Sequence, residues 1–389
     1  MSRQPTYIDV FAGAGGLSEG FIRSGFLPIA HVEQDPNACL TLKTRIAYHH
    51  LKQTGNYKTY ISYVKGEITR DTLYSAVPKA LFDSVLNEKI ATRTLEPIFA
   101  SIDTLRKNRA VDVIIGGPPC QAYSVLSRAA DTKKMKWDSR KFLYKLYAEF
   151  LSKYKPKMFV FENVPGLYTA GGGKYHEHMV NLFDKAGYAT EDMILDAADY
   201  GVVQHRRRVI LVGWKKGLPL SYPNLQMVKN RWTIADIFSD LPPLKPGGAI
   251  NNAKYIGPAS RYLRHFRIRN GLRFTTQHVT RPHNEKDRAI YRLAIRKWRE
   301  EGKNLKNDKI PAEMRTQNNV SSFLDRFKVV RSDSLSHTMI AHIAKDGHHF
   351  IHPDKSQLRS ISVREAARIQ SFPDDYYFEG TRTAAFNQI

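Results

Sequence analysis

The chain has 389 residues, 42% of them hydrophobic and 25% charged, a composition that excludes a disordered protein and allows a sizeable core. Sixty Lys and Arg against 37 Asp and Glu give a net charge of +23. A surplus of this size favours a polyanionic partner, although a merely basic protein is the alternative. With only two cysteines, a disulfide framework is excluded and a reducing compartment fits best. No run of about 18 apolar residues is present, and the first residues lack the apolar run of a secretory signal.

The first half of the chain alternates short apolar runs with amphipathic stretches. The runs predicted to be strands are residues 7–11, 28–32, 111–115, 158–161 and 208–212. Helical patterns lie between them, for example at 141–154 and 175–186. This alternation predicts an α/β fold with a parallel sheet and helices on both faces. Active groups should then lie at the carboxyl ends of the strands.

The character of the sequence changes at a Pro/Gly-rich stretch, residues 240–248, which resembles a linker. From there to about Phe327 the chain is dense in Arg, Lys and aromatic residues, a pattern that suits a nucleic-acid surface. Taken alone, residues 291–299 are more simply a solvated amphipathic helix. Regular structure is expected to resume at Phe327, with a helix at 362–370 opened by a serine cap.

A glycine-rich turn, Phe11-Ala-Gly-Ala-Gly-Gly-Leu17, follows the first predicted strand. Glycines there let the backbone pass close to a ligand. Ser18 stands where a dinucleotide fingerprint needs Gly or Ala. Glu33 ends the second strand, 20 residues beyond Gly13, where an acid binds ribose hydroxyls. The pattern predicts a nucleoside-containing cofactor, the alternative being a tight turn without a ligand.

The run Gly116-Gly-Pro-Pro-Cys-Gln121 follows the strongest predicted strand. It places Cys120 at a strand end, on a rigid Pro-Pro turn. A cysteine acts as a nucleophile only as its thiolate, which needs nearby positive charge or helix N-terminal amides. Cys39 lies in a helical run instead and is most simply a small core residue.

Two further groups border the same edge of the predicted sheet. Glu162, in Phe161-Glu-Asn-Val164, ends another strand. A turn at 198–206 leads into a strand that begins with three arginines, residues 206–208. A triple arginine is usually solvated or faces phosphate, but here it lies near the edge that Cys120 and Glu162 share.

Together these motifs resemble the DNA (cytosine-5) methyltransferase family in residue type, order and approximate spacing. The motifs that carry the resemblance are Phe11-Ala-Gly-Ala-Gly-Gly16, Glu33, Pro118-Pro-Cys-Gln121, Glu162-Asn-Val164, Gln204-His-Arg-Arg-Arg208 and Arg364-Glu-Ala-Ala-Arg-Ile-Gln-Ser-Phe-Pro-Asp374. The resemblance implies a Rossmann-like class I methyltransferase sheet with a smaller, irregular target-recognition domain. We expect a catalytic domain at 1–246, a DNA-reading domain at 247–327 and a return to the catalytic domain at 328–389.

The resemblance also implies a mechanism that needs no metal. The Cys120 thiolate would attack C6 of a cytosine flipped out of the duplex, and C5 would take the methyl group of S-adenosylmethionine, leaving S-adenosylhomocysteine. Glu162, as its acid, would hydrogen-bond N3 and Arg208 would bind O2, with Arg206 and Asn163 orienting the site. A base, which we cannot name from sequence, then removes the C5 proton and Cys120 departs.

The cofactor residues that the family implies lie mostly on the glycine-rich turn. Phe11 would contact the adenine, the backbone of Gly13 and Gly15 would approach the cofactor, Glu33 would bind the ribose and Pro118 would line the pocket. Gly16 and Leu17 complete the turn. An adenine-contacting acid is expected between Glu33 and Cys120, and we choose Asp103 over Glu67.

The segment after the cysteine, residues 124–140, is basic and corresponds to the family's mobile loop over the DNA, with Ser127 expected to enter the space left by the flipped base. Five histidines occur between residues 337 and 352. Their spacing matches no zinc pattern, so we expect ordinary surface or DNA-facing side chains.

The chain stops at Phe386-Asn-Gln-Ile389, where the family begins a Gly-Asn-(Ala/Ser)-Val segment and a final helix. We therefore expect weak cofactor binding unless a separate C-terminal segment or subunit is supplied. A single recognition region suggests a monomeric bacterial or phage modification enzyme in the cytosol, paired with a restriction nuclease. An RNA cytosine-5 methyltransferase and a non-catalytic DNA-binding protein are the alternatives.

Overall fold

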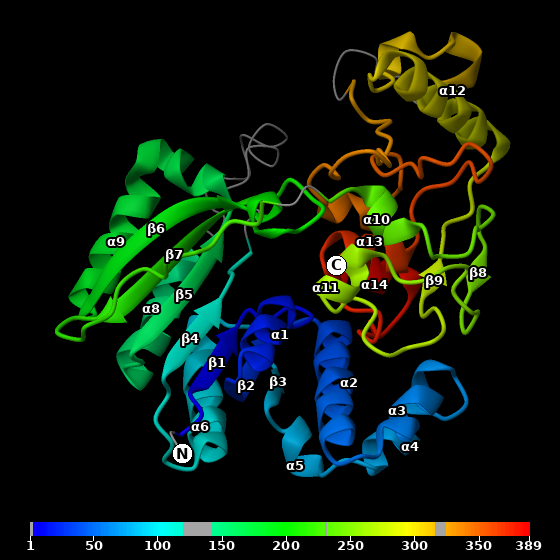
Figure 1. Ribbon diagram of the computed structural model, residues 1–389. Helices are drawn as coiled ribbons and strands as arrows, with labels where there is room; N and C mark the ends of the chain where they lie inside the picture. The colour runs from blue at the N-terminus through cyan, green and yellow to red at the C-terminus, as the bar shows by residue number, and fades with distance from the viewer. Residues whose placement is uncertain (1–2, 120–141, 230–231, 316–323) are drawn as a thin grey trace. The chain divides into compact units, whose positions relative to one another are not determined.

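The computed structural model describes residues 3–119, 142–229, 232–315 and 324–389. The chain divides into two compact units, each made of separate stretches (Figure 1). The first unit comprises residues 1–56, 71–196 and 207–226, and the second comprises 57–70, 197–206 and 227–389. The chain thus passes between the units five times, and the domain limits expected at 246 and 327 stay a prediction.

The first unit is built on a seven-stranded sheet in the order β3-β2-β1-β4-β5-β7-β6. Its strands are β1 (Thr6–Val10), β2 (Leu27–Glu33), β3 (Val85–Asn87), β4 (Val113–Gly116), β5 (Met158–Asn163), β6 (Tyr188–Asp196) and β7 (Arg207–Lys215). β7 runs antiparallel to its neighbours, β5 and β6, whereas the pairs among β1 to β5 are parallel. The α/β, Rossmann-like fold is therefore confirmed.

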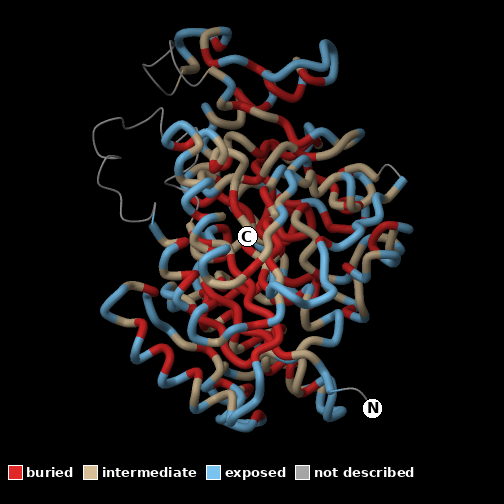
Figure 2. Tube along the Cα trace, turned by 90° about the vertical axis from the view of Figure 1, so that its left-hand side faces the viewer, coloured by how far each residue is buried: buried red, intermediate tan, exposed pale blue. Residues whose placement is uncertain are grey.

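Helices cover this sheet and supply the other half of its core. They are α1 (Gly16–Arg23), α2 (Pro36–Gln53), α4 (Arg70–Ser75), α5 (Lys79–Phe82), α6 (Leu95–Arg106), α8 (Leu143–Tyr154) and α9 (Lys174–Lys185). The first residue of α4, Arg70, is still counted with the second unit, and the rest of the helix belongs to the first. All five residues of β1 are buried. Ile8 and Val10 belong to a cluster with apolar residues of α6, α8 and α9, whereas Tyr7 belongs to a second cluster with Phe21 of α1. Figure 2 colours the buried residues red. Ile102, Tyr147 and Phe183 are fully buried members of the first cluster.

The second unit has little sheet. Its elements are α3 (Tyr57–Val64), α10 (Ile234–Phe238), α11 (Arg261–His265), α12 (Glu285–Glu301), α13 (Val363–Ile369), α14 (Arg382–Gln388), β8 (Ala249–Ile250) and β9 (His278–Val279). Short 3-10 turns complete the two units at Thr92–Thr94, Pro165–Tyr168, Ala170–Gly173, Ala197–Tyr200, Asn307–Lys309, Ala312–Met314 and Ala341–Ala344. The predicted serine cap is confirmed, since the Ser362 hydroxyl accepts the backbone N–H of Glu365 at 3.1 Å.

Segment 57–70 joins the second unit although it lies early in the sequence. The Tyr60 hydroxyl donates to the carbonyl of Asp375, and the Tyr63 hydroxyl donates to the Glu379 carboxylate, both at 2.6 Å. These bonds between residues more than 300 positions apart are not foreseeable from local pattern.

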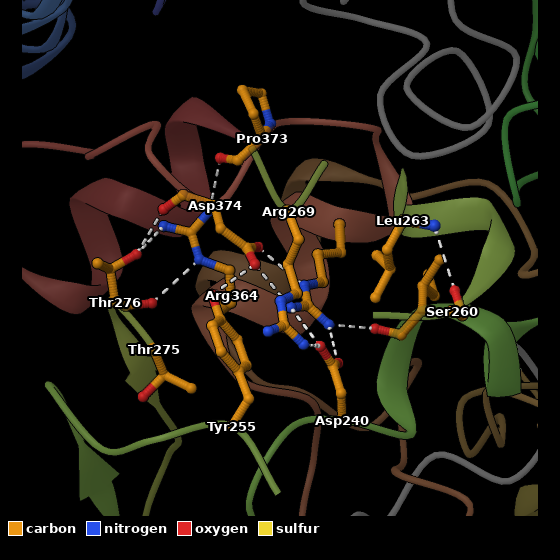
Figure 3. A network of polar contacts seen from close by, with 12 residues as sticks. Asp240, Tyr255, Ser260, Leu263, Arg269, Thr275, Thr276, Arg364, Pro373 and Asp374 are labelled. Atoms are coloured by element: carbon orange, nitrogen blue, oxygen red, sulfur yellow. Dashed lines mark hydrogen bonds and ion pairs between the residues drawn. The ribbon is translucent and has the colours of Figure 1, made fainter. Parts of the chain in front are cut away.

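A buried network of arginines and carboxylates organises the second unit (Figure 3). Arg368 donates to both oxygens of Asp374, at 2.8 and 2.6 Å, and to Asp240 at 2.5 Å. Arg269 also donates to Asp240, at 2.8 Å, and stacks on the ring of Tyr255 at 3.9 Å. Asp240 is only 1% exposed. The stretch that begins there is therefore anchored in the unit, and its interpretation as a linker was wrong because composition does not reveal buried ion pairs.

Two of the five histidines between residues 337 and 352 stack on aromatic rings of the second unit, which corrects the expectation of surface or DNA-facing side chains for these two. His352 is 6% exposed and stacks on Phe238 with an interplanar angle of 9°. His337 stacks on Phe350 at 13°. Within the described ranges, no group of three or more His, Cys, Asp or Glu could hold a metal ion. In the same ranges, no helix has the length and apolar character needed to cross a membrane.

Replacing Arg368 tests the ion-pair network. Arg368→Leu leaves two buried carboxylates without their shared cation, which we expect to lower the free energy of unfolding by about 3–5 kcal/mol. Urea unfolding followed by tryptophan fluorescence measures the change. The matched substitution Arg261→Leu, at an exposed position, should cost no more than about 0.5 kcal/mol, and equal midpoints for the two variants would contradict the network's structural role.

Burial of two histidines predicts a pH-dependent stability. It lowers the pKa of His337 to about 4 and of His352 to about 3, from an ordinary value of 6.5. The unfolded chain takes up protons at higher pH than the folded chain does, so this stability is complete above pH 6.5 and is lost as the pH falls towards 4. We expect a loss of roughly 2–4 kcal/mol between about pH 7.5 and 5, measured by urea unfolding. The loss should shrink when both histidines are replaced by glutamine, which does not titrate.

Candidate functional site

The register of the parallel strands brings their carboxyl ends to one edge of the first unit. Val10 of β1 lies opposite Val32 of β2 and Gly116 of β4, and Gly116 lies opposite Phe161 of β5. The residues that follow these positions therefore emerge side by side. They include Phe11, Glu33, Gly117 and Glu162, all predicted from the sequence to belong to the site or to its motifs.

The glycine-rich turn after β1 has a backbone that most residues avoid. Gly13 and Gly15 have φ values of 54° and 84°, and α1 begins directly afterwards at Gly16. Phe11 itself has a φ of 60°, an uncommon conformation for a bulky residue that marks a constrained site. A Cβ built on Gly13 would meet nothing within 4 Å. The turn thus has open space beside the backbone of Gly13.

Glu33 fastens this turn to β2. Its Oε2 accepts the backbone N–H of Gly13 at 2.8 Å, and its Oε1 accepts those of Gln34 and Asp35 at 2.9 and 2.8 Å. A carboxylate has about four acceptor positions, so the group is fixed and still keeps capacity to accept a hydroxyl. Glu33 is therefore held rigidly at the end of β2.

Asp9, inside β1, is a buried acid that the sequence reasoning passed over. It is 1% exposed, and its Oδ2 has no hydrogen-bond partner among the described residues. Burial, followed by the charge of Glu33, raises its pKa well above the ordinary value. The sequence did indicate an unusual residue here, because Asp9 interrupts a predicted strand that is otherwise apolar.

Gly116, the last residue of β4, and Gly117 after it allow a close approach of β1, β4 and β5. A Cβ on Gly116 would collide with the carbonyl oxygen of Val10, and a Cβ on Gly117 would lie 2.6 Å from Oε2 of Glu162. The Glu162 carboxylate therefore lies against the backbone three residues before the expected nucleophile. Cys120 itself lies outside the described residues, as do Ser127 and the predicted loop at 124–140. Pro118, two residues before Cys120, is described and buried.

Glu162 is paired with Arg208. The Arg208 Nε lies 2.7 Å from Oε1 of Glu162, and both side chains are partly exposed. β7, which carries Arg208 near its start, pairs with β5 so that Glu162 lies opposite Ile210. Asn163 is buried, and its Oδ1 accepts the N–H of Val164 at 2.9 Å. Its Nδ2 has no partner within the described part of the chain.

Arg206 belongs to the second unit by its contacts. Its Nη1 donates to the carbonyl of Met339 at 3.2 Å. The neighbouring Gln204 accepts the N–H of Met339 at 2.7 Å and forms a β-bridge with Ser336. The structure thus shows what holds Arg206, while its orienting role stays a prediction.

Asp103 is not brought to this edge. It lies in the last turn of α6 and pairs with Arg106 at 2.8 Å and Lys153 at 3.1 Å. It lines a cavity together with residues that precede β4 and β5, including Asp112 and Lys157, and so lies at the amino ends of those strands.

The residue at the corresponding place beside Glu33 is Asn87, at the end of β3. The two residues are register partners, and the Asn87 side-chain amide donates to the carbonyls of Glu33 and Gln34 at 3.1 Å each. Sequence reasoning missed Asn87 because its strand has only three residues.

Cys39 is confirmed as a core residue. It is buried, its thiol donates to the carbonyl of Glu33 at 3.3 Å, and burial raises its pKa to about 12. A thiol with such a pKa does not supply a thiolate near neutral pH.

Comparison with known proteins identifies the family of this chain. A family model described as C-5 cytosine-specific DNA methylase matches residues 85–389. The chain is 42% identical to the Type II methyltransferase M.Bpa9945I of Bacillus paralicheniformis, over 98% of this chain and 94% of that one. It is 30% identical to the Type II methyltransferase M.AgeI of Thalassovita gelatinovora, with the same two coverages.

Solved structures agree in fold. A protein assigned as a DNA modification methyltransferase, encoded within a prophage of E. coli, superimposes with a TM-score of 0.66 at 22% identity, over 99% of this chain and 93% of that one. At this identity the match supports a shared fold and no more. The family model and the two relatives carry the assignment further: this chain belongs to the C-5 cytosine-specific DNA methylases.

Proposed function

We propose that this enzyme methylates C5 of a cytosine within a specific double-stranded DNA sequence, with S-adenosylmethionine as methyl donor. We propose further that it acts in the bacterial cytosol as the modification enzyme of a restriction-modification system, because its relatives are named Type II methyltransferases. The observation that carries the chemistry is the Arg208–Glu162 pair beside Gly117. It lies on the strand edge that also carries the glycine-rich turn and Glu33.

The cofactor fits the turn and its neighbours. S-adenosylmethionine supplies an electrophilic methyl group when it is bound. Glu33 would accept a ribose hydroxyl, and the open space beside Gly13 leaves room for the ligand. Phe11 and Pro118 would bound the adenine side, with Leu17 at the start of α1. We propose Asn87 in place of Asp103 as the polar group for the adenine edge, because Asn87 is the register partner of Glu33.

Glu162 and Arg208 would hold the target base. Arg208 uses Nε for Glu162 and Nη1 for the carbonyl of Arg207, which leaves further guanidinium N–H groups for O2 of cytosine. Glu162, protonated when the base is bound, would donate to N3. Preorganised donors of this kind stabilise the negative charge that develops on the ring. Their mutual ion pair fixes both side chains before the base arrives.

Cys120 would supply the nucleophile. Its thiolate adds to C6, the electron pair of the C5–C6 bond moves to C5, and C5 takes the methyl group. Removal of the C5 proton then restores the double bond and expels the thiolate, so the cysteine is regenerated. The base must leave the duplex stack for this reaction, at a cost of a few kcal/mol.

Gly117→Ala tests the geometry of this site. The added Cβ would lie 2.6 Å from Oε2 of Glu162 and push the carboxylate off the base. We expect kcat for methyl transfer to fall at least about tenfold, equivalent to about 1.4 kcal/mol in the barrier, with little change in thermal unfolding. Gly20→Ala is the matched control, since a Cβ there meets nothing within 4 Å. A normal kcat for Gly117→Ala would contradict the placement of Glu162.

Covalent trapping tests the proposed function as a whole. The wild type is supplied with S-adenosylmethionine, any separate C-terminal segment and a duplex carrying 5-fluorocytosine in the methylated sequence. It should form an adduct that survives denaturation, because fluorine cannot leave C5 as a proton does. Cys120→Ser should form none. The sequence itself is found by bisulfite sequencing of DNA from cells that express the enzyme. An adduct on RNA and none on DNA would replace our proposal with an RNA methyltransferase.

A further inference from the structure

Helix α12 of the second unit is firmly held by one face. Ile290, Tyr291, Ile295 and Trp298 are buried there, in a cluster that also includes Phe327. The helix is closed at both ends. Asn284 accepts a backbone N–H of its first turn at 2.8 Å, and Gly302 ends it in the left-handed conformation. Its outer face is therefore presented in a fixed orientation.

The outer face carries a row of arginines. Arg292, Arg296 and Arg299 are exposed and recur at intervals of four and three residues, which places them on one side of the helix, away from the buried residues. With a rise of about 1.5 Å per residue, the row spans about 10 Å. We call these three residues the α12 arginine row.

The charge of the row is poorly compensated within the protein. The acids Glu285 and Glu301 pair with Arg288 and Lys297. Neither Arg292 nor Arg296 forms an ion pair within the part of the chain that the structure describes. Arg299 donates to a backbone carbonyl, that of Pro353, at 3.4 Å.

The sequence also places like charges next to each other. Arg292 has Arg288 four residues before it and Arg296 four residues after it, and Glu300, four residues after Arg296, is the one acid that continues this spacing. Like charges at this spacing repel, whereas a merely solvated helix face commonly alternates its signs. The repulsion is relieved when an anion with regularly spaced charges lies along the row.

We propose that the α12 arginine row binds consecutive phosphates of duplex DNA and supplies a sequence-independent part of the affinity. The inference rests on the proposed function, because it takes DNA as the substrate. The guanidinium fork matches the oxygens of a phosphate. Three side chains of the same kind along one line, without an exposed amide between them, suit a repeating backbone better than the changing edges of bases.

The experiment compares the salt dependence of DNA binding. Arg292→Gln/Arg296→Gln keeps helix-forming side chains and removes two charges. Binding to two duplexes of unrelated sequence is followed by fluorescence anisotropy between about 50 and 300 mM salt. We expect the slope of log K against log salt to become shallower by about 0.9 for each phosphate that the variant no longer neutralises, hence about 1.8, and both duplexes to bind more weakly by the same factor. At saturating DNA, kcat should be unchanged.

Lys79→Gln/Lys107→Gln is the matched control. It removes the same charge from exposed positions in the first unit that precede β3 and β4, and it should leave the slope unchanged. An unchanged slope for the α12 variant, or the same change in the control, would overturn the proposal. The proposal would also be overturned if the variant bound more weakly only to the duplex that contains the methylated sequence. That result would indicate that the row reads bases. The proposed function is tested separately, on the wild type alone. A wild type that neither binds nor methylates DNA would refute the proposed function, whatever the α12 variant does.

Discussion

The candidate site depends on a steric constraint at the end of β4, where two consecutive residues have no side chain. Because Gly116 and Gly117 leave this space free, the carbonyl of Val10 and the carboxylate of Glu162 approach the same short piece of backbone from either side. The turn that follows β1 and the acid that ends β5 are then held on the same edge as the chain that leads to Cys120. The residues that we propose for the cofactor and for the target base thus share one sheet edge, which fixes Glu33 and Glu162 relative to each other.

Much of the first unit could be predicted because its strands are apolar on both faces. The five predicted runs correspond to β1, β2, β4, β5 and β7, and the rule that parallel strands end at one edge placed Glu33 and Glu162. Two strands gave no such signal. β3 has three residues, and β6 is a half-exposed strand at the edge of the sheet with polar side chains along it.

Asp103 shows the limit of choosing a residue by chemical type. We expected an acid near a strand end, and of the two acids considered Asp103 was the nearer to a predicted strand. The residue beside Glu33 is instead Asn87, at the end of β3. β3 could not be found in the sequence, because its pairing with β2 is known only from the structure. The second unit was harder for a different reason. Arg364 donates to backbone carbonyls of Thr276, Pro373 and Tyr376. Arg364 thus binds backbone carbonyls that neighbouring strands would pair in a sheet. Because this part of the unit has few regular strands, the sequence shows no alternation of apolar and polar residues there.

The second unit is assembled from three separate stretches of chain, and this limits how it could be transferred to a related enzyme. A gene segment that encodes residues 227–389 would carry most of the unit into another enzyme, but it would leave 57–70 and 197–206 behind. The partners of Asp375 and Met339 would then come from the recipient. Recombination that preserves the fold must therefore match these two short segments as well. Substitution of a few surface residues within the unit avoids that requirement, because it leaves both short segments with their present partners.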